Sequence, residues 1–389
     1  MTHTVNTPVE PRTNGWLAVG SVAAGSLTLV LSEFLPIGLL PEMSAGLGVS
    51  NGTAGLTMMA PGLVAAVAAP ALTLAAGKVD RRTFLLAMSA LFAVSNALAA
   101  IAPNFTLVLA ARMLLGVALG GFWTIGGSIA SRLVTERSVT TAAAVIIAGV
   151  SAGTVISLPV GALIGQLADW RYAFAAAAAL SVGVLVAQFF LLPSIPVNQV
   201  VRVDTLIALT RNRKARIGLV ATALIFAGHF LAYTYLVPYL ADVAKVSAGL
   251  TSTLLLVYGV AGLAGNFTAG ATLTRSPRAT ITVGTLALAA TVVLLPQASA
   301  STPAVIALVA LWGYSWGALP LSLQFWMLNA SPSAKEGGLA LFVSVIQVAL
   351  AGGSLVGGLI VDHLGVPPAF TLGAVLAALA AGLIWTFRD

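Results

Sequence analysis

Long apolar segments, separated by short polar breaks, are the main pattern along the chain. Each segment contains about 20 residues or more and ends at charged residues, proline or polar residues. Segments this long and continuously apolar predict membrane-spanning helices, since the strands of a membrane barrel contain about ten residues of alternating polarity. The twelve predicted spans cover residues 16–40, 51–77, 82–102, 105–133, 138–167, 170–192, 216–240, 247–274, 278–297, 302–330, 336–364 and 367–387.

The composition supports the same interpretation. Of the 389 residues, 59% are hydrophobic and 7% are charged, whereas a soluble domain has about 25% charged residues. So few charged side chains cannot cover a water-exposed surface. The predicted fold class is therefore an all-α polytopic membrane protein.

The longest polar break divides the spans into two groups of six. It covers residues 193–215 and contains a dense group of basic residues. We therefore predict a disordered cytoplasmic tail at 1–15, an N-terminal six-helix bundle at 16–192, a cytoplasmic linker at 193–215 and a C-terminal six-helix bundle at 216–389. Within the linker, a short helix at the membrane interface is expected to begin at Asp204.

The positions of Lys and Arg predict the orientation in the membrane. If both termini are cytoplasmic, nearly all of the 18 basic residues lie on the cytoplasmic side, as the positive-inside rule requires. Topology and contact with anionic lipids then account for the net charge of +7, and no nucleic-acid partner is expected.

Catalytic and cofactor motifs are not found in the sequence. It contains no cysteine, which excludes disulfides and thiolate metal sites. It also contains no Walker loop, no H-E-x-x-H motif and no serine, histidine and acid at usable spacing. We therefore expect that the chain is not an enzyme, holds no metal or cofactor, and does not use ATP as its energy source.

Three ionisable residues within the spans are candidate functional residues, and two of them, Glu33 and His229, are candidates for proton exchange. Glu33 is the acid that lies most clearly inside a span, where a charge costs about 2.5–3.5 kcal/mol and desolvation favours the protonated form. His229 lies near the middle of the seventh span and can exchange a proton near neutral pH. Arg112 keeps its charge and therefore needs carbonyl, acid or water partners. For each of the three, the alternative is a purely structural hydrogen bond.

The two halves contain similar segments at these positions. The sequence "EFLPIGLLP" begins at Glu33 in the first span, and "HFLAYTYLVP" begins at His229 in the seventh. Repeated halves in a transporter place the substrate site between the two bundles near the membrane midplane, and one bundle rocks against the other.

Several motifs resemble those of the major facilitator superfamily, in particular its bacterial drug:proton antiporter branch with sugar-, arabinose- and purine nucleoside-efflux permeases. The segment "RMLLGVALGGFW" is similar to the R-x-x-x-G pattern and places the motif arginine at Arg112. The fifth span, "GVSAGTVISLPVGALIG", is similar to the glycine-rich antiporter motif, and "DWRYAF" resembles the W-R-x-x-F that follows it. In the antiporter motif the matching residues are Gly149, Gly153, Pro159 and Gly161. The resemblance covers essentially the whole chain and implies that Arg112 assists proton coupling by biasing a nearby acid.

The loop between the second and third spans departs from the family pattern. "AAGKVDRRTF" is a shortened form of G-x-x-x-D-R-x-G-R-R, in which Asp80 stands near the acidic position and Arg81 and Arg82 supply the basic part. The corresponding loop in the second half, "GATLTRSPR", has no acid. The charge lock between bundles that the resemblance implies is therefore expected to be asymmetric or weak.

Aromatic and amide side chains within the spans are candidates for lining a substrate cavity. Flat rings with one polar group bind sugars and nucleobases by stacking and bind drugs by burial. The same residue types are also ordinary packing residues in membranes. The candidates are Phe122, Trp123, Tyr233, Tyr235, Tyr258, Asn266, Trp312, Trp316, Gln324 and Gln347.

Together these observations predict a secondary transporter of the bacterial cytoplasmic membrane, with both termini in the cytoplasm. The expected activity is proton-coupled efflux of a small organic solute such as a sugar, nucleoside or drug, by alternating access. Its expected partners are this solute, protons and the lipid bilayer, and we expect a monomer. Two alternatives stay open: proton-coupled uptake of the same solutes, and a membrane receptor or assembly protein that kept the fold without transport.

Overall fold

The computed structural model describes residues 15–387 except 76–78, 197–210, 274 and 332–334. Most of the predicted tail, the central part of the predicted linker and the interfacial helix expected at Asp204 lie outside these residues. Within the described ranges the regular structure is entirely helical, without a β-strand.

The helices follow one another along the chain with short connections. They are α1 (Gly15–Gly38), α2 (Leu40–Leu47), α3 (Asn51–Ala75), α4 (Arg81–Ala100), α5 (Phe105–Leu133), η1 (Glu136–Ser138), α6 (Val139–Leu167), α7 (Trp170–Leu191), α9 (Arg213–Tyr233), α10 (Leu236–Pro238), η2 (Tyr239–Val243), α11 (Ala248–Leu273), α12 (Pro277–Leu294), α13 (Thr302–Ala330), α14 (Lys335–Leu364) and α15 (Val366–Thr386).

Twelve of these helices are long and apolar enough to cross a membrane, which confirms the predicted number of spans. One predicted span is shorter than expected, because the helix from the segment 216–240 ends at Tyr233 and continues as the short elements α10 and η2. The break follows from Pro238, which has no N–H to donate to the carbonyl of Thr234 four residues earlier.

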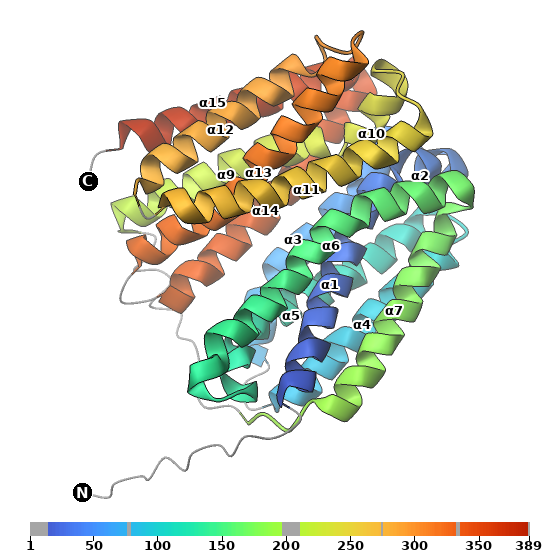
Figure 1. Ribbon diagram of the computed structural model, residues 1–389. Coiled ribbons are helices and arrows are strands. Elements are labelled where there is room, and N and C mark those ends of the chain that lie inside the picture. The colour runs from blue at the N-terminus through green and yellow to red at the C-terminus, as the bar shows by residue number, and fades with distance from the viewer. Residues whose placement is uncertain (1–14, 76–78, 197–210, 274, 332–334, 388–389) are drawn as a thin grey trace, which may run out of the picture.

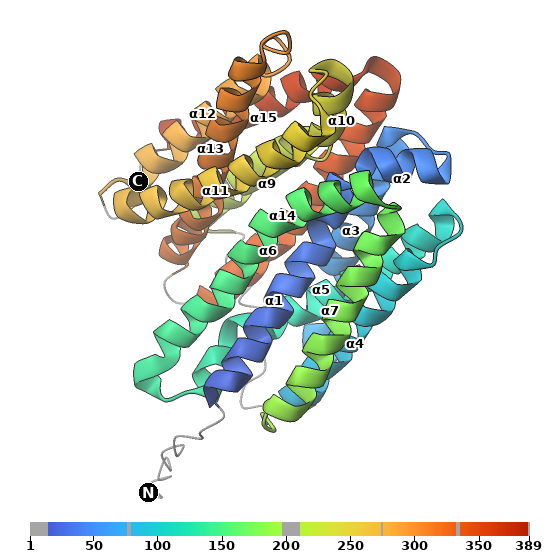
Figure 2. The same cartoon turned by 45° about the vertical axis from the view of Figure 1, so that its right-hand side comes forward.

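The helices of the two halves pack according to the same plan (Figures 1 and 2). In the first half α1 packs on α6, α3 on α5, and α4 on α7. In the second half the corresponding contacts are α9 with α14, α11 with α13, and α12 with α15. The two halves therefore share one arrangement of helix contacts.

The bundles contact each other through α3 with α14 and through α6 with α11. Figure 1 shows them close together at the end where α2 and α10 lie, and further apart at the end where α1 begins and α15 ends. Hydrogen bonds join them at the first of these ends, which we call the closed end. There Asp362 of α14 accepts hydrogen bonds from Gly52 N and Ser50 Oγ at the start of α3, and Gln166 Nε2 of α6 donates to Ala248 O at the start of α11.

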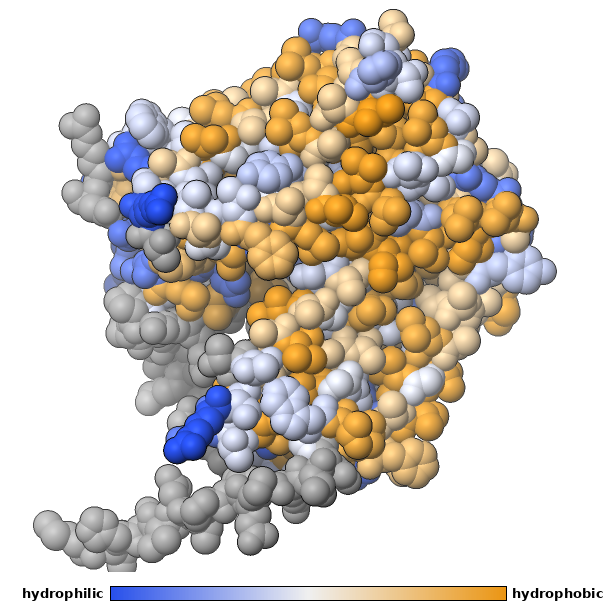
Figure 3. All heavy atoms as spheres, in the orientation of Figure 1, coloured by the Kyte–Doolittle hydropathy of each residue, from blue (hydrophilic) through white to orange (hydrophobic). Residues whose placement is uncertain are grey.

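Apolar side chains cover the outer faces of the helices, whereas strongly hydrophilic residues gather toward the ends (Figure 3). Large apolar side chains such as Phe190 and Phe267 are more than three-quarters exposed, at 76% and 79%. A continuous apolar exterior of this kind is stable in lipid and not in water.

Candidate functional site

Arg112 of α5 is completely buried and reaches two neighbouring helices. Its Nη1 donates a hydrogen bond to the carbonyl of Ser32 on α1 at 2.6 Å, and its Nε donates to the carbonyl of Thr57 on α3 at 3.0 Å. Each carbonyl lies four residues before a proline, Pro36 and Pro61 respectively, and proline has no N–H to complete the helical hydrogen bond. The guanidinium therefore supplies the donors that both helices lack.

Glu33 lies beside this cation and is 6% exposed. Arg112 Nη2 donates a hydrogen bond to the backbone carbonyl of Glu33 at 2.8 Å, and the guanidinium also acts electrostatically on the carboxyl group. The side-chain amide of Gln347 on α14 lies close to the same carboxyl group. The buried acid therefore has neighbours in both bundles, and Gln347 is the predicted lining residue that lies beside it.

An aromatic contact joins the neighbours of Glu33 and His229. Phe34 of α1 stacks on Phe230 of α9, with ring centroids 5.9 Å apart and planes inclined by 10°. The two similar sequence segments of the halves therefore meet in space, and each carries its ionisable residue beside the contact.

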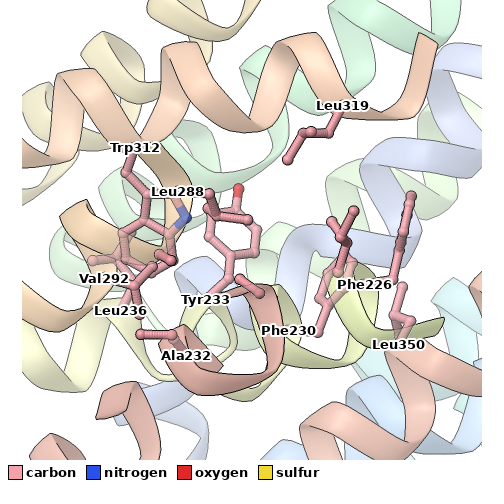
Figure 4. Packing of buried hydrophobic residues seen from close by; sticks show 14 of the residues in the cluster. Phe226, Phe230, Ala232, Tyr233, Leu236, Leu288, Val292, Trp312, Leu319 and Leu350 are labelled. Carbon is pink, nitrogen blue, oxygen red and sulfur yellow. The ribbon is translucent and has the colours of Figure 1, made fainter. Parts of the chain in front are cut away.

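His229 lies in a cluster of aromatic rings from α9, α11 and α13, part of which is visible in Figure 4. Its ring is stacked on Trp316 with centroids 3.5 Å apart and planes inclined by 2°. Trp312 Nε1 donates a hydrogen bond to His229 Nδ1 at 3.2 Å. Because Nδ1 accepts, the neutral imidazole carries its proton on Nε2, and this buried Nε2 has no hydrogen-bond partner.

Tyr233 and Tyr258 complete the cluster. Their rings are stacked with centroids 5.0 Å apart, and Tyr258 packs edge-on against Trp312. The Oη of Tyr258 is buried without a hydrogen-bond partner. The cluster therefore presents flat apolar faces together with two donors, His229 Nε2 and Tyr258 Oη, that a polar ligand can satisfy.

The remaining predicted lining residues lie in different environments. Phe122 is fully buried in the core of the first half, where it packs on Phe92 of α4. Trp123 is partly buried and packs edge-on against Phe122. Tyr235 is buried at the closed end, where its hydroxyl donates to Ser354 O. We therefore exclude Phe122 from the proposed lining, and Tyr235 contributes to the closed end instead.

Two amide candidates lie apart from the aromatic cluster. Asn266 is exposed on α11, next to the highly exposed Phe267. Gln324 is partly buried on α13, one turn beyond Pro320 toward the end of that helix. Neither residue is brought into contact with Glu33 or His229 in this conformation.

The loop motif stabilises the first half internally. Asp80 caps α4 by accepting from Arg82 N, and its other oxygen accepts from Ser194 Oγ and Ile195 N after α7. Burial opposes the charged form, but these hydrogen bonds outweigh it and lower the pKa of the Asp80 carboxyl below its ordinary value. The basic residues make similar contacts: Arg82 Nη2 donates to Phe189 O, and Arg81 N donates to Ile195 O.

The glycine-rich motif of α6 allows this helix to lie close to α1. A side chain at Gly149 would collide with Ala23 O, and one at Gly153 would meet Leu27 O. Gly161 has Leu35 as its neighbour, and α6 continues through Pro159 without a break. The motif therefore acts in packing between helices.

Several residues of the site were not predicted from the sequence. Pro36 and Pro61 carry a signal that can be read directly, since a proline inside a span leaves the carbonyl four residues earlier without its helical donor. Asp362 and Gln166 lie at the ends of predicted spans, where polar residues are ordinary. Their contacts across the bundles depend on tertiary structure.

Comparison with known proteins agrees with this architecture. The sequence model of the Major Facilitator Superfamily matches residues 22–338. Transcription regulatory protein OpdE from Pseudomonas aeruginosa is 32% identical over 379 residues, which cover 96% of this chain and 94% of that protein. Purine ribonucleoside efflux pump NepI from Escherichia coli O6:K15:H31 is 31% identical over 369 residues, which cover 95% of this chain and 93% of the pump.

Solved structures show the same fold at lower sequence identity. The human organic anion transporter MFSD10 (TETRAN) superimposes with a TM-score of 0.70 at 18% identity, over 96% of this chain and all of that one. A D-xylose–proton symporter superimposes with a TM-score of 0.74 at 16% identity, over 96% of this chain and 98% of that one. The chain is thus a multi-pass inner-membrane protein, and it belongs to the Major Facilitator Superfamily of transporters.

Proposed function

We propose that this transporter exports a small organic solute in exchange for protons, and that nucleosides are the favoured solute class. The observation that carries the proposal is the buried carboxyl group of Glu33, which interacts with Arg112 in its own bundle and with Gln347 in the other. An acid in this position changes the contacts between the bundles whenever it gains or loses a proton.

The aromatic cluster around His229 supports a substrate with a flat polar ring. Trp316, which is partly buried, offers an aromatic ring on which a nucleobase can stack, and His229 Nε2 and Tyr258 Oη offer donors to its ring nitrogen or carbonyl acceptors. The likeness to NepI, whose name describes a purine ribonucleoside efflux pump, points to the same class.

The conformation fits the loading state of an exporter if the termini are cytoplasmic, as the distribution of basic residues predicts. The bundles are joined by hydrogen bonds at the opposite, closed end. A solute then enters between the bundles from the cytoplasm. After the bundles rock, Glu33 takes a proton from outside, the solute leaves, and the neutral carboxyl group permits the return. Glu33 then releases this proton to the cytoplasm, which completes the exchange.

The membrane potential sets the scale of the coupling. One charge that moves across 100 mV contributes about 2.3 kcal/mol. For each net charge moved, this free energy maintains a ratio of about 50-fold between the solute concentrations on the two sides of the membrane.

Flux measurements with the purified full chain in proteoliposomes test this proposal. A pH gradient is imposed with labelled inosine or adenosine at equal concentration on both sides, and we expect the nucleoside to accumulate on the acidic side, opposite to the movement of protons. Movement in the same direction would support the uptake alternative. Binding without flux would support a receptor role, for which the name of the relative OpdE, a transcription regulatory protein, is the specific argument.

A further inference from the structure

A pocket lies in the C-terminal half, away from Glu33 and His229. It has a volume of about 390 Å³ and lies where α9 and α12 begin and α13 and α15 end. Its lining residues are Lys214, Pro277, Arg278, Trp326, Asn329 and Phe387. None of them belongs to the proposed transport site.

Aromatic rings form a fixed wall of this pocket. Trp326 is 5% exposed, and its Nε1 donates a hydrogen bond to Lys214 O at 3.0 Å. Its ring packs against Phe387 with centroids 5.8 Å apart. Through Trp326, these contacts hold the end of α13 against the start of α9 and against Phe387, which follows α15.

Cationic groups surround the wall, and none of the described residues that line the pocket is acidic. The guanidinium of Arg213 lies 5.4 Å from the centroid of Phe387, and Lys214 Nζ lies 5.7 Å from that of Trp326. Arg278 lies at the start of α12, a helix end that favours anions, and its buried Nε has no hydrogen-bond partner. A bound anion with several acceptor oxygens satisfies this donor of Arg278.

The pocket is continuous with the surface that faces lipid. The guanidinium of Arg278 lies 5.1 Å from the centroid of Trp385, which is 58% exposed. Trp385 belongs to an outward stripe of α15 that also contains Leu379 and Val375, which are 58% and 47% exposed. A phospholipid whose phosphate group occupies the pocket would therefore place its hydrocarbon chains along this stripe.

We propose that this pocket binds the phosphate group of an anionic phospholipid, from the membrane leaflet on the side where α1 begins. The recognised chemistry is a phosphate anion, with aromatic side chains at the level of the headgroup. Free phosphate has the same anionic group but no hydrocarbon chains, so the two sources differ in whether the outward stripe of α15 contributes to binding.

Thermal unfolding of the delipidated full chain in detergent, with and without added lipid, tests the proposal. The probes are phosphatidylglycerol, phosphatidylcholine and inorganic phosphate, and the proteins are the parent, Arg278→Gln, Arg278→Lys and a control, Arg137→Gln. Arg137 is an exposed basic residue at the same end of the first half. Variants are compared only when their unfolding temperatures in detergent alone equal that of the parent, and Arg278→Lys replaces Arg278→Gln if the latter does not fold.

We expect phosphatidylglycerol to raise the unfolding temperature of the parent and of Arg137→Gln. The phosphatidylglycerol concentration that gives half of this rise in unfolding temperature should be about fivefold higher in Arg278→Gln. In Arg278→Lys the increase in this concentration should be smaller. Equal effects of phosphatidylglycerol and phosphatidylcholine would overturn the proposal, as would an equal response of the Arg278→Gln and Arg137→Gln variants. Full stabilisation by inorganic phosphate alone would also overturn it, in favour of a soluble anion.

Discussion

The ring of Phe34 stacks on the ring of Phe230 across the two bundles, with centroids 5.9 Å apart. Each phenylalanine directly follows the ionisable residue of its half, Glu33 or His229. Phe34 and Phe230 are therefore the two side chains that connect Glu33 to the aromatic cluster around His229. This proximity is the structural basis on which we propose that protonation and substrate binding affect each other.

The first prediction concerns Arg112 as the donor to carbonyls left free by proline. Arg112→Gln should lower the free energy of unfolding by about 2 kcal/mol, because two buried carbonyls lose their partners. In a Pro36→Ala background, the new N–H at position 36 can reach Ser32 O, so the cost of Arg112→Gln should fall by about 1 kcal/mol. Thermal and denaturant unfolding of all four proteins in detergent gives this double-mutant cycle. Equal costs in both backgrounds would show that Pro36 is not the reason for the contact.

The second prediction concerns His229 in substrate recognition. His229→Phe keeps the aromatic packing but removes both the Nε2 donor and the Nδ1 acceptor of Trp312 Nε1. The KM for a nucleoside should rise about tenfold, which corresponds to the loss of roughly one hydrogen bond to the solute. The number of protons exchanged per solute should stay the same. Tyr314→Phe serves as the control, because Tyr314 lies on an outward face of α13 at 36% exposure. A changed proton count with an unchanged KM would instead make His229 part of the proton path.

The third prediction concerns the closed end. Asp362→Asn removes a charge that interacts favourably with the start of α3, and should favour opening of this end. The chain has no cysteine, so a single Met58→Cys substitution can report on opening, since Met58 is completely buried in the core cluster shared by the two bundles. A membrane-impermeant thiol reagent should label it several times faster in Asp362→Asn than in the parent or in Asp242→Asn, an exposed control. Identical labelling rates would mean that Asp362 does not hold this end closed.

The fourth prediction concerns the glycines between α1 and α6. Gly149→Ala should destabilise the protein by about 1–3 kcal/mol, since the added methyl group collides with the backbone at Ala23. Gly183→Ala on α7 is the matched control, because no atom beyond the adjoining residues and backbone of its own helix lies within 4 Å of its added methyl group. It should be neutral or slightly stabilising, as alanine favours helix over glycine. Comparable unfolding temperatures for the two variants would contradict the proposed close packing.

Much of the fold could be predicted because the physical signal is local. Charge and proline end each apolar run, and the bounds of the helices follow from them. The break after Tyr233 was missed, although Pro238 gives its signal, because an apolar run was treated as one helix. Glu33, Arg112 and His229 could be found for a related reason: an ionisable side chain in a span is costly unless it has a role.

The environments of the aromatic side chains could not be predicted in the same way. Phe122 and Trp316 are both large rings inside spans, yet Phe122 packs within the first half while Trp316 stacks on His229. Every face of such a helix is apolar, so periodicity does not distinguish the face toward lipid from the faces toward the bundle or the cavity. Likewise, nothing local in the sequence indicates that Asp362 reaches the start of α3.

The most direct test of the central claim is the response of Glu33→Gln to a proton gradient in proteoliposomes. We expect gradient-driven nucleoside movement to fall at least tenfold, because glutamine cannot gain or lose the proton, whereas exchange of labelled for unlabelled nucleoside without a gradient should continue. Glu136→Gln, which changes an exposed acid in η1, should behave like the parent in both assays. Gradient-driven movement at the parental rate in Glu33→Gln would contradict the proposal that this buried acid couples transport to protons.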